Sequence, residues 1–86
     1  MIFERTTRFE RAYLKLRGDD AQRVDKALAR LAEDPAHPSL RVKRMQGTDG
    51  IWEARASDSL RFTFERDGDR VTLRIVGPHD RTLDRP

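Results

Sequence analysis

The 86-residue sequence contains no cysteine and only two histidines. Without cysteine the chain can form neither a disulfide nor a thiolate metal site. The two histidines, His37 and His79, lie far apart in the chain and show no metal-ligand spacing. We therefore expect no metal site and no cofactor.

Long apolar runs are also missing. No segment approaches the roughly 18 apolar residues of a membrane span, and the N-terminal "MIFERTTRFE" lacks the apolar core of a secretory signal. The sequence thus predicts a cytoplasmic protein that has no membrane partner. A chain of this length suits a single domain, residues 1–86.

Charged residues are abundant, at 38% of the chain, and the net charge is +3. Most of the 18 basic residues are arginine, which binds phosphate through two parallel hydrogen bonds and stacks on bases. This balance favours a polyanionic partner such as nucleic acid. A coding bias toward arginine is the alternative explanation.

The first half of the chain predicts one strand and two helices. Residues 1–6 alternate as a short strand does, and "TRFE" from Thr7 to Glu10 matches a capping box with Thr7 as N-cap. The first helix should end near Gly18, and Asp19 or Asp20 should cap the second. The apolar faces of the two helices comprise Phe9, Ala12, Tyr13 and Leu16, and then Val24, Ala27, Leu28 and Leu31.

After the prolines of "EDPAHPS" the apolar period changes to two. Four strands are predicted, at residues 40–45, 51–56, 60–66 and 70–76, with short turns that favour an antiparallel meander. The predicted class is α+β: an N-terminal strand, a helical hairpin, and a four-stranded antiparallel meander.

Alternation assigns the strand side chains to two faces. The face predicted to pack on the helices collects Leu40, Val42, Trp52, Ala54, Ala56, Leu60, Phe62, Phe64, Val71, Leu73 and Ile75. The solvent face collects Arg41, Lys43, Glu53, Arg55, Arg61, Thr63, Thr72 and Arg74. Like charges on adjacent strands are unfavourable unless an anion binds them, although a polar outer face is also what any one-sided sheet shows.

Three segments, in their order along the chain, resemble those of the RelE/ParE superfamily of bacterial toxins. "RMQGTDGIWEAR" is similar to the family's "L-K-G … Y/W-x-x-R" hairpin, "SLRFTFER" to its "Y-R-V-x-Y" strand, and "VGPHDRTL" to its "G-x-H-x-x-x-Y" ending. The resemblance implies a RelE-like two-layer fold and a cognate antitoxin that silences the toxin. Nuclease members cut messenger RNA on the ribosome without a metal, whereas the ParE branch poisons DNA gyrase. The histidine-bearing ending favours the ribonuclease branch.

The resemblance also implies site residues. Arg61 matches the strand arginine that contacts the scissile phosphate, Arg55 a neighbouring basic position, and His79 the general acid. Metal-free cleavage of RNA needs a base, cations and an acid, and histidine in water has a pKa of about 6.5. Glu53 or Asp58 could serve as the base. The expected RNA-binding residues are His37, Arg41, Lys43 and Arg74.

Each of these site residues could instead have a purely structural role. Glu53 could be a salt-bridge partner of its arginine neighbours, and Asp58 a simple turn residue. His37 and His79 could be loop residues, and Trp52 is expected in the core. Leu60 and Leu83 replace aromatic residues of the family, and the chain ends too soon after His79 for a C-terminal catalytic helix to be expected. A gyrase poison and an inactive member that only binds its antitoxin therefore remain open as alternatives.

Overall fold

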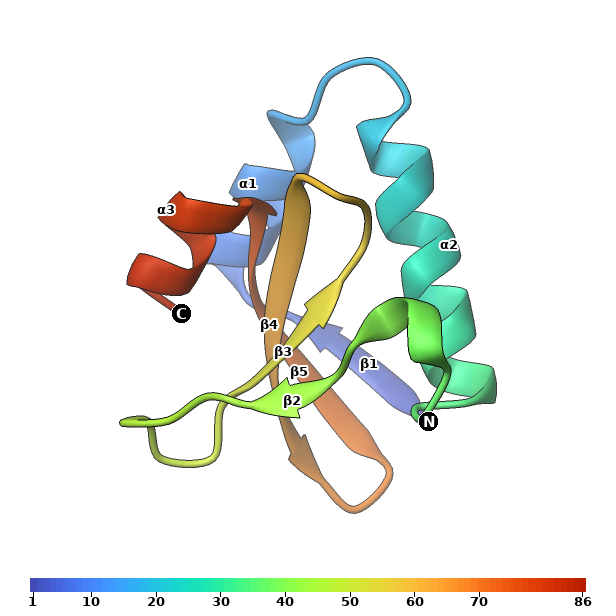
Figure 1. Ribbon diagram of the computed structural model, residues 1–86, viewed down its shortest axis with the longest axis vertical. Coiled ribbons are helices and arrows are strands. Elements are labelled where there is room, and N and C mark those ends of the chain that lie inside the picture. Colours follow the sequence, from blue (N-terminus) through green and yellow to red (C-terminus); the bar gives the residue numbers. More distant parts are fainter.

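The computed structural model describes residues 1–86 as a five-stranded sheet with helices packed around it (Figure 1). In chain order the elements are β1 (Ile2–Arg5), α1 (Thr7–Leu14), α2 (Asp20–Glu33), the 3-10 turn η1 (Pro38–Leu40), β2 (Lys43–Arg44), β3 (Trp52–Arg55), β4 (Leu60–Asp67), β5 (Arg70–Pro78) and α3 (His79–Asp84). The predicted α+β class is confirmed.

The strands follow the order β1-β5-β4-β3-β2. β2 to β5 form the expected antiparallel meander, and β1 joins it parallel to β5. This pairing makes β5 an interior strand, with β1 on one edge of the sheet and β2 on the other. The helical hairpin α1–α2 is the long connection between β1 and the meander.

The first helix starts one residue earlier than "TRFE" predicts. Thr6, not Thr7, is the N-cap, because its Oγ1 accepts a hydrogen bond from Phe9 N at 3.0 Å. The same hydroxyl donates to Arg74 O on β5 at 2.9 Å, a long-range contact that no local pattern reveals. The helix ends at Leu14 rather than near Gly18.

The strand predicted at residues 40–45 is reduced to Lys43–Arg44. Pro38 starts a 3-10 turn whose N-cap is His37, with His37 Nδ1 accepting from Ser39 N at 3.2 Å. Arg41 then adopts a left-handed backbone with φ 47°, which no strand can continue. Leu40 is nevertheless buried as predicted.

A β-bulge changes the predicted face of one core residue. In the β4–β5 ladder the cross-strand partner of Thr63 is Ile75, and that of Phe64 is Leu73. Arg74, which lies between Leu73 and Ile75, therefore has no partner on β4. Alternation resumes one residue out of phase, so Val76 is buried at 3% exposure and Ile75 is only partly buried. The prediction that Ile75 belongs to the core was wrong for this reason.

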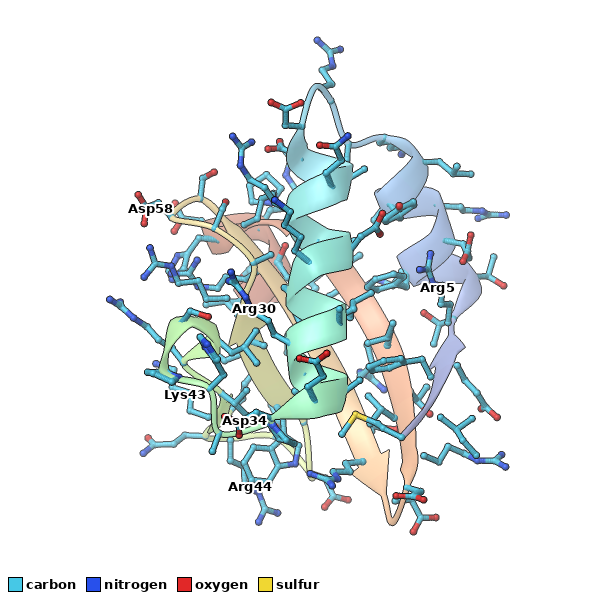
Figure 2. The ribbon with its side chains drawn as sticks, turned by 90° about the vertical axis from the view of Figure 1, so that its right-hand side faces the viewer. Arg5, Arg30, Asp34, Lys43, Arg44 and Asp58 are labelled. Carbon is cyan, nitrogen blue, oxygen red and sulfur yellow. The ribbon has the colours of Figure 1, made fainter.

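The chain does form a C-terminal helix, contrary to expectation. α3 contacts β4 and β5 and lies on the side of the molecule away from α2 (Figures 1 and 2). Thr63 Oγ1 donates to Pro86 O at 3.1 Å, and Thr63 is fully buried. The face predicted to be open to solvent is therefore covered over β4 and β5, and it is open mainly toward β2 and β3.

The opposite face carries the hydrophobic core, where α1 and α2 pack on the sheet. Trp52 is partly buried and packs against this core, as its parity predicts. None of the helices combines the length and the apolar character that a membrane span requires. The buried apolar residues are Phe9, Val24, Ala27, Leu28, Leu31, Leu40, Ala54, Leu60, Phe62, Phe64, Val71, Leu73 and Val76.

Candidate functional site

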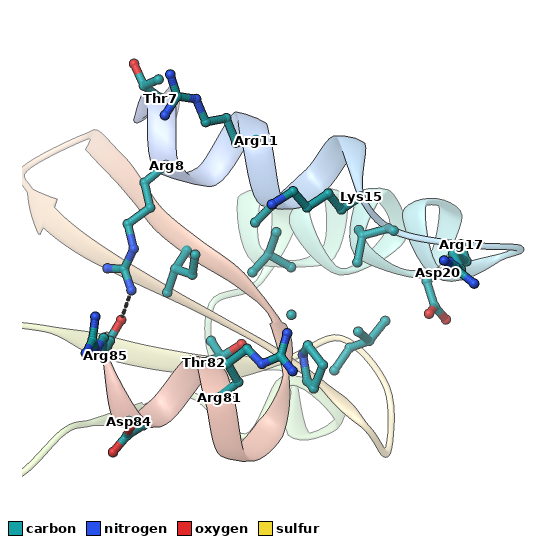
Figure 3. A pocket seen from close by; sticks show the side chains of 17 residues that line it. Thr7, Arg8, Arg11, Lys15, Arg17, Asp20, Arg81, Thr82, Asp84 and Arg85 are labelled. Atoms are coloured by element: carbon teal, nitrogen blue, oxygen red, sulfur yellow. Dashed lines mark hydrogen bonds between the residues drawn. The ribbon is translucent and has the colours of Figure 1, made fainter.

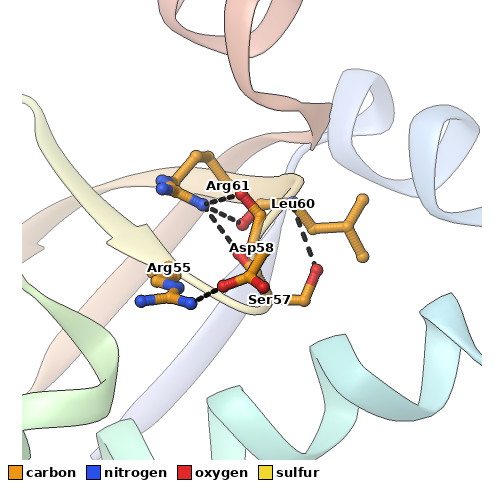
Figure 4. Close-up of polar contacts among 5 residues, drawn as sticks. All are labelled: Arg55, Ser57, Asp58, Leu60 and Arg61. Atoms are coloured by element: carbon orange, nitrogen blue, oxygen red, sulfur yellow. Dashed lines mark hydrogen bonds and ion pairs between the residues drawn. The ribbon is translucent and has the colours of Figure 1, made fainter.

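Two arginines face each other at the end of the β3–β4 ladder. Arg55 and Arg61 are cross-strand partners, and both are partly buried. Arg55 forms an ion pair with Asp58 in the turn between the strands (Figure 4). Arg61 has no carboxylate partner, so the pair carries a positive charge that the protein does not fully balance.

The turn between β3 and β4 holds the Arg61 guanidinium by one nitrogen (Figure 4). Arg61 Nη1 donates to the carbonyl oxygens of Ser57 at 2.7 Å, Leu60 at 3.0 Å and Asp58 at 3.3 Å. Its Nε and Nη2 atoms form no hydrogen bond with the protein. Those two donors form the side of the guanidinium that can bind two oxygens of one phosphate.

The pKa of Arg61 is lowered from its ordinary value. Burial disfavours the charged form most, repulsion from Arg55 and Arg41 acts in the same direction, and Glu53 opposes both. The guanidinium remains charged near neutral pH, since arginine is effectively always protonated. A bound anion would relieve the desolvation and the repulsion.

Glu53 lies under this cluster of cations. Its side chain is buried, and the Nζ atom of Lys43, its partner on β2, lies 3.0 Å from its Oε1. Lys43 itself is 72% exposed. Glu53 therefore acts at least as a charge partner inside the cluster. This is the salt-bridge role that the sequence offered as the alternative to a catalytic base.

His79 is brought to the same end of the sheet. As the first residue of α3 it donates its backbone N–H to Ser59 O at 2.9 Å. Its imidazole is half-exposed, with Nδ1 3.1 Å from Asp80 Oδ1. The backbone of His79 is thus tied to the β3–β4 turn that also holds Arg61, and half of its side chain is accessible to a ligand.

The structure does not join every predicted residue to this site. Arg74 donates from Nε to Pro86 O at 3.0 Å and pairs with Glu65 at 2.9 Å. His37 caps η1, and no hydrogen bond or ion pair links it to the cluster. We use "basic cluster" for the residues that do gather: Arg41, Lys43, Glu53, Arg55, Asp58 and Arg61. The backbone of His79 is tied to the turn that joins β3 and β4 in this cluster.

A second cationic feature was missed by the sequence analysis. A groove of about 970 Å³ separates α1 from α3 (Figure 3). Its lining includes the apolar residues Ala12, Leu16, Ile75 and Val76. We call it the basic groove because six cations line it, none of which forms an ion pair within the chain: Arg8, Arg11, Lys15, Arg17, Arg81 and Arg85.

A signal for the basic groove is present in the sequence. Arg8, Arg11 and Lys15 follow the i, i+3, i+7 spacing that places side chains on one helical face. That face could be found from the sequence, but the part of α3 that lies opposite could not. Only Asp20 and Asp84 bring negative charge to the lining.

No protein-family model matches the sequence, and no curated protein matches it significantly. Solved structures do match. The RelB–RelE antitoxin–toxin complex from Methanococcus jannaschii shares 16% identity at a TM-score of 0.73, covering 98% of this chain and 96% of its own. The chain has the fold of the RelE-like toxins.

Two further structures extend this likeness. The YoeB/ParE toxin from Agrobacterium tumefaciens shares 15% identity at a TM-score of 0.75, over 92% of this chain and 99% of its own. YafQ from E. coli shares 13% identity at a TM-score of 0.76, over 92% and 93%. The RelE-like fold therefore spans nearly the whole chain, at identities too low to carry over the role of any residue.

Proposed function

We propose that this chain is the toxin of a type II toxin–antitoxin system, a member of the RelE/ParE superfamily that cleaves messenger RNA on the ribosome in the cytoplasm without a metal. One observation carries the proposal: Arg61 offers a free Nε–Nη2 edge in a cluster of cations, and the turn that holds it also binds the backbone N–H of His79, whose imidazole is half-exposed. The RelE-like fold supports it.

The proposed reaction is an internal transesterification. A base removes the 2′-OH proton, the 2′ oxygen attacks the adjacent phosphorus, and the bond to the 5′ oxygen breaks. Protonated His79 donates its proton to that leaving oxygen. Arg61 and Arg55 stabilise the negative charge that develops on the non-bridging phosphate oxygens. The products are a 2′,3′-cyclic phosphate and a 5′-hydroxyl.

Burial distinguishes the two candidates for the base. Glu53 is 6% exposed and lies beneath Lys43, whereas the Asp58 side chain is 95% exposed at the tip of the turn. A 2′-OH can reach Asp58 more easily, so we assign Asp58 as the base and Glu53 as the charge partner. Under this assignment Asp58→Asn abolishes cleavage, and Lys43→Ala weakens RNA binding more than it slows the chemical step.

The proposed protein partner is an antitoxin that binds in the basic groove. An amphipathic acidic segment suits the groove, because apolar side chains would pack on Ala12, Leu16 and Ile75 while carboxylates paired with Arg8, Arg11 and Lys15.

Charge reversal at Arg11 and Lys15 should leave toxicity intact and abolish its neutralisation by the protein encoded beside the toxin. Arg66→Glu, a reversal outside the groove, is the matched control.

The decisive test is tightly controlled induction in bacteria, followed by pulses of labelled methionine and labelled thymidine. Early loss of methionine incorporation supports the proposal, whereas early loss of thymidine incorporation indicates gyrase poisoning. No loss of either indicates an inactive member. His79→Ala and Arg61→Ala should each remove the effect. Arg66→Ala, which changes an exposed arginine near the other end of β4, should retain it.

A further inference from the structure

A single turn contacts three of the proposed functional residues: Arg55 and Arg61 through their side chains and His79 through its backbone. Residues 57–59, the "SDS" turn between β3 and β4, provide two of the carbonyls that hold Arg61, the carboxylate that pairs with Arg55, and the carbonyl that accepts from His79 N. We propose that this turn positions the phosphate clamp relative to the acid, and that Ser57 is the positioning residue that holds the turn in shape.

The Ser57 hydroxyl closes the turn. Ser57 Oγ accepts a hydrogen bond from Leu60 N at 3.2 Å, while Leu60 O accepts from Ala56 N at 3.0 Å and from Ser57 N at 3.4 Å. Leu60 is anchored in the core at 3% exposure. The turn is thereby tied to a buried side chain, and the Ser57 carbonyl is directed at Arg61 Nη1, the shortest of the three contacts.

This arrangement determines which part of Arg61 is available to a ligand. The carbonyls occupy Nη1 and prevent the guanidinium from rotating about its Nε–Cζ bond. The Nε and Nη2 donors are left as a preorganised fork for two phosphate oxygens. A side chain that is already fixed loses less conformational freedom when the phosphate binds, so the turn contributes to affinity without touching the ligand.

The same turn also determines the separation of the clamp from the acid. Ser59 O accepts from His79 N at 2.9 Å, which ties the first residue of α3 to the turn that holds Arg61. Ser57 Oγ therefore acts through Arg61 and His79 rather than on the substrate. The inference rests on the proposed ribonuclease function for its catalytic consequence, but the restraint on Arg61 does not depend on any activity.

The test compares four forms of the full chain: wild type, Ser57→Ala, Ser57→Asn and Ser59→Ala. Ser57→Asn keeps a side-chain acceptor that can close the turn. Ser59→Ala is the matched control, because it removes a serine hydroxyl from the same turn and keeps the backbone carbonyl that His79 uses. Equal urea midpoints for the four forms would establish that a difference in phosphate binding or in RNA cleavage is a local effect and not a loss of folded protein.

The first readout is ¹⁵N NMR of the Arg61 guanidinium during titration with inorganic phosphate. Wild type, Ser57→Asn and Ser59→Ala should show separate Nη1 and Nη2 signals and respond at similar phosphate concentrations. Ser57→Ala should average the two signals and need about tenfold more phosphate, as expected for one lost hydrogen bond. Unchanged signals in Ser57→Ala, or equal changes in Ser59→Ala, would overturn the inference.

The second readout is cleavage of messenger RNA on purified ribosomes. Ser57→Ala should lower kcat/KM about tenfold, and Ser57→Asn should restore most of it. If the wild type cleaves no RNA, the proposed function fails while the NMR result still decides the positioning role. If the wild type cleaves RNA and Ser57→Ala does so equally well, the positioning role fails while the ribonuclease stands.

Discussion

Arg61 lies directly opposite Arg55 across the β3–β4 ladder, and only Arg55 has a carboxylate partner. Like charges placed opposite each other on a sheet reduce its stability. Burial lowers the pKa of Arg61 most, and the repulsion from Arg55 lowers it further. Such an arrangement is understandable where an anion is to be bound, since residues arranged for function often reduce stability.

Arg61→Leu should therefore leave the free energy of unfolding unchanged or raise it by up to about 1 kcal/mol, while abolishing toxicity. The leucine keeps apolar contacts and removes the repulsion with Arg55. Urea denaturation of the purified variant measures the stability. A loss of more than about 1 kcal/mol would contradict this prediction, because it would mean that the three carbonyl contacts outweigh the repulsion.

Glu53→Ala should lower the free energy of unfolding by about 1–3 kcal/mol. It removes a buried carboxylate and leaves neighbouring cations without their charge partner. Lys43→Ala is the control, and should cost less than about 1 kcal/mol because a mostly exposed lysine contributes little. Chemical denaturation of both variants would check this order, and a larger effect for Lys43→Ala would reverse our assignment of the buried partner.

Val76→Ala should lower the free energy of unfolding by about 2 kcal/mol, and Ile75→Ala by about 1 kcal/mol or less. The bulge at Arg74 buries Val76 in the core and leaves Ile75 only partly buried, although both residues line the basic groove. Regular alternation from Leu73 would give the opposite order. Thermal unfolding of the two variants side by side decides between the registers.

The hydrogen bond from Tyr13 Oη to Asp25 Oδ1, 2.8 Å long, should make stability fall at high pH. It raises the pKa of Tyr13, and burial adds to the rise. A pKa that is higher in the folded state stabilises the protein below the unfolded value of about 10. That contribution is lost as pH rises through the higher folded value.

Tyr13→Phe should therefore be less stable than the wild type by less than about 1 kcal/mol at neutral pH. The gap should narrow above about pH 10. Denaturation measured from pH 7 to pH 11 would follow this change, and no other phenol titrates in the same range because Tyr13 is the only tyrosine. A gap that is independent of pH would show that Asp25 does not act on the phenol.

Several features of the site could be predicted from the sequence, and others could not. The positions of Arg55, Arg61 and Glu53 on one face follow from strand alternation, which is local and regular. The different position of Arg74 follows from a bulge, where the β4–β5 register shifts between Thr63 and Phe64. Alternation cannot reveal such a shift, because it assumes an uninterrupted period of two.

The amino-acid sequence by itself determined the order of the helices and strands from β1 to β5, the α+β class and most of the core, because hydrophobic periodicity and turn residues act over a few positions. The tertiary structure alone decided the Thr6 cap, the cover of α3 over the sheet, the basic groove and the hold of the "SDS" turn on Arg61 and His79. The Thr6 cap, the cover by α3 and the tie of His79 to the turn depend on contacts such as Thr6 Oγ1 to Arg74 O, between residues that only the folded chain brings together.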